Sequence, residues 1–246
     1  MTTDRPIIAL RELGLVRRDG NWAFTLYVRD LQVARGQRIA LTGPNGSGKS
    51  TLIEILALSL APIGDGRFRL SAPDLGIDLD VMELWRDGAE AALTRLRRDL
   101  FGYVQQVGGL LGFLTIGQNI ALTQRLSRRR DGRWLAELVQ RLGIGDLLDR
   151  YPDQVSVGQR QRATIVRALA HRPPVLLADE PTASLDASSA QWVMSLLVEE
   201  AERSGTALVL ASHDHDLIGR FGFQEVGPLL QANRSGQFSV FDGSRR

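Results

Sequence analysis

The stretch Leu41–Leu52, LTGPNGSGKSTL, decides the fold of this 246-residue chain. An apolar run, RIALTG, leads into its glycines, and KSTLIEILALSL follows with the spacing and length of a helix. Strand, glycine-rich loop and helix in this order predict a phosphate-binding unit, because glycine permits tight turns and helix N-termini attract anions. The stretch also contains Lys49, the one lysine among thirty lysine and arginine residues.

Gly43–Ser50 fits the pattern G-x-x-x-x-G-K-[ST]. We expect Lys49 to reach the β and γ phosphates of a nucleotide and the Ser50 hydroxyl to ligate Mg²⁺. A compact ammonium fits between two phosphates where the wider guanidinium does not. The pattern alone leaves kinases, GTPases, helicases and transport ATPases open. The expected nucleotide-binding residues of this loop are Gly43, Pro44, Asn45, Gly46, Ser47, Gly48, Lys49, Ser50 and Thr51.

Composition narrows the class of protein without naming a function. A hydrophobic fraction of 43% and a charged fraction of 24% are typical of a globular chain, and a net charge of +2 does not indicate a nucleic-acid partner. The absence of cysteine excludes disulfides, and three histidines argue against a histidine-built zinc centre. No signal peptide is evident, and the most apolar stretches fall short of the roughly 20 residues of a membrane helix. These features suit a cytosolic protein.

The order of periodic segments predicts an α/β fold. IIALRELGLV and WAFTLYVRDLQVA alternate as two strands joined by a turn at RRDGN. Helical segments fill the region from about 71 to 169, and strands alternate with helices again from VLLADE onward. We therefore expect a single domain whose core, with a β subdomain, spans about 1–70 and 170–246, and whose helical subdomain spans about 71–169. SRRRDGRW interrupts the helices as a polar loop, and its arginines are interpreted as a solvated face.

The strand VLLADEP ends in two adjacent acids, Asp179 and Glu180. Open α/β sheets bind ligands at the carboxyl edge, so we expect Asp179 to hold Mg²⁺ through water or to bond Ser50. Glu180 would polarise the attacking water. His213 ends the next apolar strand, where its imidazole would reach the γ phosphate, whereas His171 and His215 are interpreted as structural.

The segment VSVGQRQRATIVRALAH separates the possible nucleotide-binding families. With GPNGSGKST, FGYVQQ, LLADEP, SLD and ASHD, in this order and spacing, it resembles the ATP-binding cassette family, whose signature is Leu-Ser-Gly-Gly-Gln. The resemblance covers nearly the whole chain. It implies a P-loop NTPase core with a mostly parallel sheet, an N-terminal antiparallel β subdomain and an inserted helical subdomain.

The resemblance also implies a head-to-tail homodimer with each ATP held between one phosphate loop and the partner's signature. Ser156, Gly158 and Gln159 would then meet the γ phosphate of the partner's nucleotide, and Asp186 would make contact across the dimer. Gln106 matches the family's loop glutamine, a Mg²⁺ contact, with Gln105 as the alternative.

An aromatic residue shortly before the first glycine stacks on adenine in this family. Trp22 is the candidate here, with Phe24 and Tyr27 as alternatives and a strand-face role for Trp22 equally open.

One residue departs from the family pattern. Val157 stands where the signature has its first glycine, and a β-branched residue does not readily adopt positive φ. Either its side chain points away from the nucleotide, or dimer closure weakens and hydrolysis slows. The presence of Glu180 and His213 favours the first interpretation.

The region LRRDLFGYVQQVGGLLGFLTIGQNIAL resembles the cassettes of bacterial lipoprotein-release and macrolide-export transporters. This resemblance implies a separate integral membrane permease subunit, and a position on the cytoplasmic face of the inner membrane. Two alternatives stay open: a soluble cassette ATPase of DNA repair or ribosomes, and a regulatory cassette that binds ATP with weak turnover. The long coiled-coil insertion or second cassette typical of the soluble types is not evident, and no nucleic-acid partner is expected.

Overall fold

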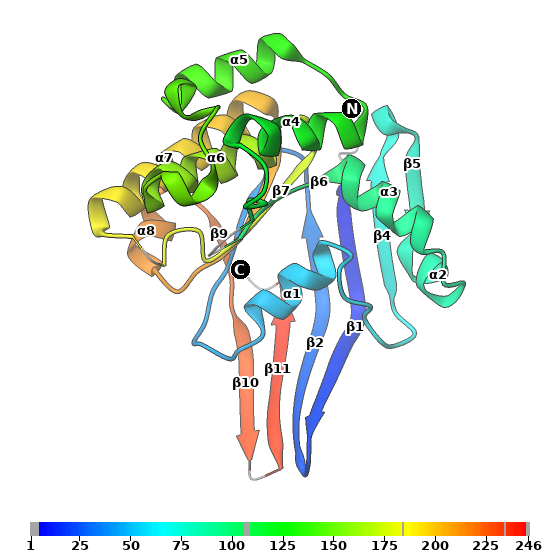
Figure 1. The fold of residues 1–246 in the computed structure, drawn as a ribbon. Helices are drawn as coiled ribbons and strands as arrows, with labels where there is room; N and C mark the ends of the chain where they lie inside the picture. The colour runs from blue at the N-terminus through cyan, green and yellow to red at the C-terminus, as the bar shows by residue number, and fades with distance from the viewer. Residues whose placement is uncertain (1–4, 106–108, 184, 234, 245–246) are drawn as a thin grey trace.

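Two β-sheets form the frame of the molecule in the computed structural model (Figure 1), which describes residues 5–105, 109–183, 185–233 and 235–244. One sheet has five strands in the order β6-β7-β8-β3-β9, all parallel. Four of its strands, β3, β6, β7 and β8, are short and mostly buried, as expected for strands covered on both faces, whereas the edge strand β9 is mostly exposed. Their bounds are β3 Arg38–Leu41, β6 Phe101–Val104, β7 Val175–Asp179, β8 Ala207–Ala211 and β9 Gln224–Val226.

The other sheet has six strands in the order β10-β11-β2-β1-β4-β5. Its neighbours are antiparallel except for β11 and β2, which run parallel. The bounds are β1 Ile8–Asp19, β2 Trp22–Val33, β4 Arg67–Ala72, β5 Ile77–Asp80, β10 Pro228–Asn233 and β11 Gly236–Asp242. The predicted turn between the first two strands shortens to Gly20 and Asn21, because β1 continues through Asp19.

The helices complete the fold. They are α1 Lys49–Leu56, α2 Val81–Arg86, α3 Glu90–Leu100, α4 Ile116–Ser127, α5 Gly132–Arg141, α6 Val157–Leu169, α7 Ala187–Ser204 and α8 His215–Arg220. Short 3-10 turns lie at Pro73–Leu75, Gly145–Leu147 and Pro152–Gln154. No helix within the described ranges has both the length and the apolar character needed to cross a bilayer.

Strand alternation divides the apolar side chains between two cores. Val175 and Leu177 of β7 face a core that includes α1 and the six-stranded sheet, whereas Leu176 and Ala178 face a core that includes α4 to α8. Both faces of β7 are buried. Its last residues lie at the edge of the parallel sheet, beside α1. This arrangement confirms the predicted α/β architecture.

The range 71–169 is not purely helical, in contrast to the sequence prediction. β5 pairs with β4 at the edge of the six-stranded sheet, and β6 joins the parallel sheet beside β7. Both have four residues. Such short segments carry little periodicity, and the partner of β6 lies far away in the sequence, so local pattern does not detect them.

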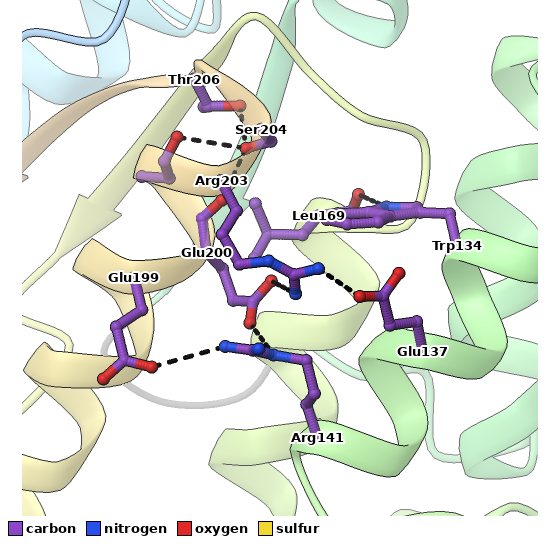
Figure 2. Close-up of polar contacts among 10 residues, drawn as sticks. Trp134, Glu137, Arg141, Leu169, Glu199, Glu200, Arg203, Ser204 and Thr206 are labelled. Atoms are coloured by element: carbon purple, nitrogen blue, oxygen red, sulfur yellow. Dashed lines mark hydrogen bonds and ion pairs between the residues drawn. The ribbon is translucent and has the colours of Figure 1, made fainter.

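Salt bridges join the helical layer to the core helix α7 (Figure 2). Glu200 of α7 is fully buried, and its Oε1 accepts a hydrogen bond from Arg141 Nε of α5 at 2.5 Å. Arg203 of α7 bonds Glu137 of α5 and lies 3.5 Å from Glu200 Oε2. Trp134 Nε1 donates to the carbonyl of Leu169 at 3.1 Å. The salt bridges hold α5 against α7, and the Trp134 hydrogen bond holds α5 against α6. Removing Arg141 would leave the buried Glu200 carboxylate with less compensation for its charge.

His171 makes the stability of the fold sensitive to acid. Burial, and then the charge of Arg129, lowers the pKa of this imidazole from 6.5 to about 4. The unfolded chain therefore takes up a proton between these values while the folded chain does not. The free energy of unfolding should fall by up to about 3 kcal/mol as the pH drops from 6.5 to 4, relative to a chain without this group.

Urea denaturation at neutral and acidic pH measures this effect. His171→Gln should remove most of the acid destabilisation, whereas His215→Gln, which alters an exposed histidine, should retain it. An unchanged pH dependence in His171→Gln would show that other groups cause the acid lability.

Candidate functional site

The loop between β3 and α1 has the backbone of a phosphate cradle. Gly43, Gly46 and Gly48 have φ values of 124°, 78° and 97°, which favour glycine. An added Cβ at Gly48 would lie 2.6 Å from Leu26 Cδ1 and 2.8 Å from Phe24 Cζ. Gly48 therefore needs its hydrogen both for conformation and for close packing against β2.

The beginning of α1 is suited to an anion. Gly48 is the N-cap residue and supplies no side-chain hydrogen bond to the first N–H groups of the helix. Those groups lack acceptors within the helix and carry the positive end of its dipole. The Ser47 hydroxyl oxygen is buried without a hydrogen-bond partner among the described residues. Unsatisfied donors around a tight loop are what a phosphate group would satisfy.

Lys49 folds back over this loop. Its Nζ donates to the carbonyl of Gly43 at 2.8 Å and to that of Pro44 at 3.2 Å. The Lys49 side chain is 5% exposed, and Nζ lies 3.7 Å from Glu180 Oε1. The ammonium thus connects the phosphate loop with the carboxylate at the end of β7.

Asp179 and Ser50 lie together at the edge of the parallel sheet. Ser50 Oγ donates to Asp179 Oδ1 at 2.9 Å, one of the two arrangements expected for Asp179. Burial raises the pKa of Asp179, the Ser50 hydrogen bond opposes the rise, and the charge of Glu180 adds to it. Burial and the charge of Asp179 also raise the pKa of Tyr103 to about 12. A cation here would relieve the excess of negative charge.

Oxygen ligands from Ser50 and Asp179 fit Mg²⁺, which takes few protein ligands together with phosphate oxygens. Among the residues that the structure describes, no cluster of three or more His, Cys, Asp or Glu forms an all-protein metal site. The third candidate ligand, Gln106, lies outside the described residues. Gln105 is described: it follows β6, and its side chain is exposed. A Cβ added to Gly109 would lie 3.6 Å from Gln105 Oε1.

Glu180 is held in a strained and specific position. It has φ 45°, in the left-handed region that a glutamate rarely adopts, and its N–H donates to the carbonyl of Ala211 at 3.0 Å. Its carboxylate oxygens lie 3.1 and 3.2 Å from His213 Nδ1. Strain of this kind is characteristic of functional sites. The structure therefore brings His213, Glu180 and Lys49 together.

The signature segment forms the beginning of α6. Ser156 is the N-cap residue: its Oγ accepts from Gln159 N–H at 3.2 Å, and Gln159 Oε1 accepts from Ser156 N–H at 2.9 Å. A Cβ added to Gly158 would meet no atom within 4 Å, so this surface is open. No hydrogen bond or ion pair between described residues joins Ser156 or Gly158 to the phosphate loop.

Val157 occupies the first position of α6. It is not among the described residues with positive φ, and it is 62% exposed. Its side chain is exposed in the single chain, and that it points away from the partner's nucleotide stays a prediction. A helical backbone does not require glycine here.

Asp186 begins α7 as its N-cap residue. Its carboxylate accepts hydrogen bonds from both the N–H and Oγ groups of Ser188 and Ser189, at 2.5–3.1 Å. These bonds, led by that of the Ser188 side chain, hold the pKa of Asp186 well below its usual range. A contact across a dimer would use a carboxylate that is already oriented by its own helix.

Strand alternation separates the three candidate aromatics. Phe24 is 8% exposed and its ring lies against Gly48. Trp22 lies two residues before Phe24, so it faces the same side of β2, and it is 44% exposed at the start of the strand. Tyr27 has the opposite orientation, and its hydroxyl bonds Glu12. Trp22 is thus the accessible aromatic on the phosphate-loop side of β2.

The sequence interpretation missed two supports of the phosphate loop. Gln237 Nε2 donates to the carbonyl of Gly46 at 3.1 Å, and Ser239 Oγ donates to that of Ser47 at 2.6 Å. Both donors belong to β11, almost at the other end of the chain. No local motif marks them, because only the pairing of β11 with β2 brings them to the loop.

Comparisons with known proteins agree with this geometry. A family model described as ABC transporter matches residues 28–183. The chain is 34% identical to the lipoprotein-releasing system ATP-binding protein LolD of Gluconobacter oxydans, over 86% of this chain and 90% of that protein. It is 35% identical to LolD of Granulibacter bethesdensis, over 90% and 95% of the two chains. It is also 38% identical to the macrolide export ATP-binding/permease protein MacB of Shigella flexneri, over 75% of this chain and 27% of MacB.

Solved structures give the same result. The dimeric structure of MJ0796, a bacterial ABC transporter cassette, superposes with a TM-score of 0.74 and 30% identity, covering 89% of this chain and 93% of that one. A post-hydrolysis state of MJ0796 bound to ADP and Pi superposes with the same score, identity and coverage. These similarities agree with the phosphate loop, the acidic end of β7 and the signature segment at the start of α6. The chain is a member of the ABC transporter family.

Proposed function

We propose that this chain binds and hydrolyses Mg-ATP as the ATPase subunit of a transporter, driving a separate integral membrane permease. The observation that carries the proposal is the convergence of Lys49, Ser50, Asp179 and Glu180 at the loop between β3 and α1. Cationic, hydroxyl and carboxylate groups at one phosphate cradle are the set that phosphoryl transfer to water requires.

Each residue has a defined part in this mechanism. The glycine loop and the first turn of α1 donate N–H groups to the phosphates, and Lys49 leaves the carbonyls of Gly43 and Pro44 to meet them. Ser50 and Asp179 would hold Mg²⁺, with Gln106 a further proposed ligand. The metal, when bound, neutralises charge on the phosphate oxygens. Glu180 accepts the proton of the attacking water, and His213 positions that carboxylate and contacts the γ phosphate.

Two copies of the chain would complete the site. Ser156, Gly158 and Gln159 of one subunit would contact the γ phosphate bound by the partner, with Asp186 beside them, and Trp22 would stack on the adenine. The support is that Ser156, Gly158 and Gln159 lie at the beginning of α6 and Asp186 at that of α7, and that no hydrogen bond or ion pair between described residues joins Ser156 or Gly158 to the chain's own phosphate loop. ATP binding would favour the closed dimer and hydrolysis would release it, because a ligand shifts states through differential affinity.

The place of action is proposed to be the cytoplasmic face of the inner membrane. The support is the extent of the similarity: the chain covers 90% and 95% of two relatives named as ATP-binding proteins of lipoprotein release. It covers 27% of MacB, whose name combines ATP-binding and permease functions. A separate permease subunit is therefore the proposed partner.

Metal removal tests the catalytic proposal. Phosphate release from ATP should fall to background with EDTA and recover when excess Mg²⁺ is added, because the Ser50 and Asp179 oxygens suit this cation. Release that is equally fast in EDTA would contradict the proposed role of these residues.

Val157→Gly tests the departure from the family signature. Since Val157 has a helical backbone and an exposed side chain, we expect phosphate release within about twofold of wild type, a barrier change under about 0.5 kcal/mol. The matched variant Gly158→Val adds a side chain to the open surface proposed to receive the partner, and should slow release much more. A tenfold gain in Val157→Gly would instead favour the weak-turnover interpretation.

A further inference from the structure

The connection between α4 and α5 concentrates unpaired positive charge. Arg125, Arg128, Arg130 and Arg133, here called the arginine patch, have exposed side chains. No ion pair or side-chain hydrogen bond involving any of the four occurs among the described residues. Leu126 lies beside them in the chain and is 56% exposed. Four exposed arginine side chains and one exposed leucine thus lie within nine consecutive residues.

The acids near the patch are already engaged. Asp131 caps α5 by accepting from Trp134 N–H at 2.9 Å, and it pairs with Arg172 at 2.9 Å. Glu137 of α5 pairs with Arg203. Glu137 also attracts Arg133 at longer range, but no acid among the described residues forms an ion pair with the patch.

The backbone keeps the patch together. Arg128 ends α4 in the left-handed region, with φ 56°, and α5 begins at Gly132. Side chains from the last turn of one helix and the first turn of the next therefore emerge from one tight connection. In Figure 1, α4 and α5 lie at the end of the molecule away from the tips of β10 and β11. Arg129 differs from the four, because it is half-buried and its charge acts on His171.

We propose that the arginine patch binds an anionic lipid surface, with Leu126 at the level of the headgroups. Charge complementarity supports this occupant, since each basic side chain near such a surface strengthens binding. The exposed Leu126 side chain would bury apolar surface among the lipid headgroups, a contribution that a purely electrostatic partner does not use. The aromatic residue of this connection, Trp134, is 4% exposed, so it offers no surface for stacking bases. Nucleic acid is therefore the less suitable partner.

This contact goes beyond the proposed function, because it requires neither ATP nor a permease subunit. It would orient the ATPase on the membrane before or during its contact with a partner. A net charge of only +2 for the whole chain means that the attraction must be local to the patch. Substitution within the patch should therefore matter far more than a change of net charge elsewhere.

Co-sedimentation of the full chain with vesicles tests the proposal. Vesicles of equimolar phosphatidylglycerol and phosphatidylcholine should bind it, phosphatidylcholine vesicles should not, and high salt should release it. Arg128→Gln, Arg130→Gln and Arg133→Gln combined should weaken binding about a hundredfold, at roughly fivefold for each cation. ATP hydrolysis in solution should stay unchanged, so failure of this proposal is distinguishable from failure of the proposed ATPase.

The matched control removes three charges elsewhere. Arg18, Arg67 and Arg220 are exposed and form no ion pair among the described residues, and their combined change to Gln should leave vesicle binding within about twofold. Equal loss in the control, or equal binding to phosphatidylcholine, would overturn the proposal. Tighter binding of the patch to a single-stranded oligonucleotide than to anionic vesicles would overturn it in favour of nucleic acid.

Discussion

Glu180→Gln should slow phosphate release by about a hundredfold to ten-thousandfold, the usual range for loss of a general base. The glutamine amide retains the size of the side chain but accepts no proton from the attacking water. The structure supports this expectation through the position of the carboxylate, 3.7 Å from Lys49 Nζ and within 3.2 Å of His213 Nδ1. Single-turnover phosphate release at saturating Mg-ATP measures the chemical step directly.

The same variant should accumulate the closed dimer, because ATP binding continues while hydrolysis stops. Size exclusion with Mg-ATP should show a dimer for Glu180→Gln and a smaller dimer fraction for wild type. Glu225→Gln is the matched control: this glutamate pairs with His215 at 2.9 Å on an exposed strand, and its loss should leave both measurements unchanged. A monomer at saturating Mg-ATP, or wild-type phosphate release in Glu180→Gln, would count against the mechanism.

Lys49→Arg should weaken ATP binding about a hundredfold although the charge is retained. A lost hydrogen bond to a charged group costs about 1.5–3 kcal/mol, and 2.7 kcal/mol corresponds to about a hundredfold. Lys49 is 5% exposed and bonds two loop carbonyls, which leaves little room for a planar guanidinium. Titration with a fluorescent ATP analogue measures the affinity.

The control for this prediction is Arg95→Lys, the reverse exchange at an exposed arginine without an ion pair among the described residues. It should leave ATP affinity unchanged. Circular dichroism should confirm that Lys49→Arg remains folded. Affinity within threefold of wild type in Lys49→Arg would show that charge alone suffices at this position.

Local motifs predicted the elements that carry the phosphate site. The segment from β3 through the glycine loop to α1 follows from RIALTGPNGSGKSTLIEIL, since apolar pattern, positive φ at glycine and helical spacing are all short-range properties. The acids Asp179 and Glu180 were also expected at the end of a buried strand, where β7 places them. Here each local preference agrees with the final fold.

The sequence predicted the short strands and the ion pairing of surface charges less well. β5 and β6 interrupt the range 71–169 because β4 and β7 supply their hydrogen-bond partners. β10, which was not predicted, pairs with β11 and is exposed along most of its length. Four to six residues contain too little alternation to distinguish such a strand from a loop. The arginines of SRRRDGRW are exposed as expected, but only the structure shows that the nearby acids already have partners.

The sequence by itself determined that this chain has a phosphate loop, a carboxylate-ended strand and a cassette signature in family order, because each depends on a few adjacent residues. Tertiary structure decided how these parts meet. It places Glu180 between Lys49 and His213, turns Val157 to solvent at the start of a helix, and supports the loop through Gln237 and Ser239 of β11. The physical reason is that strand pairing and side-chain burial join residues from distant parts of the chain, and their spacing along the sequence contains no information about that distance in space.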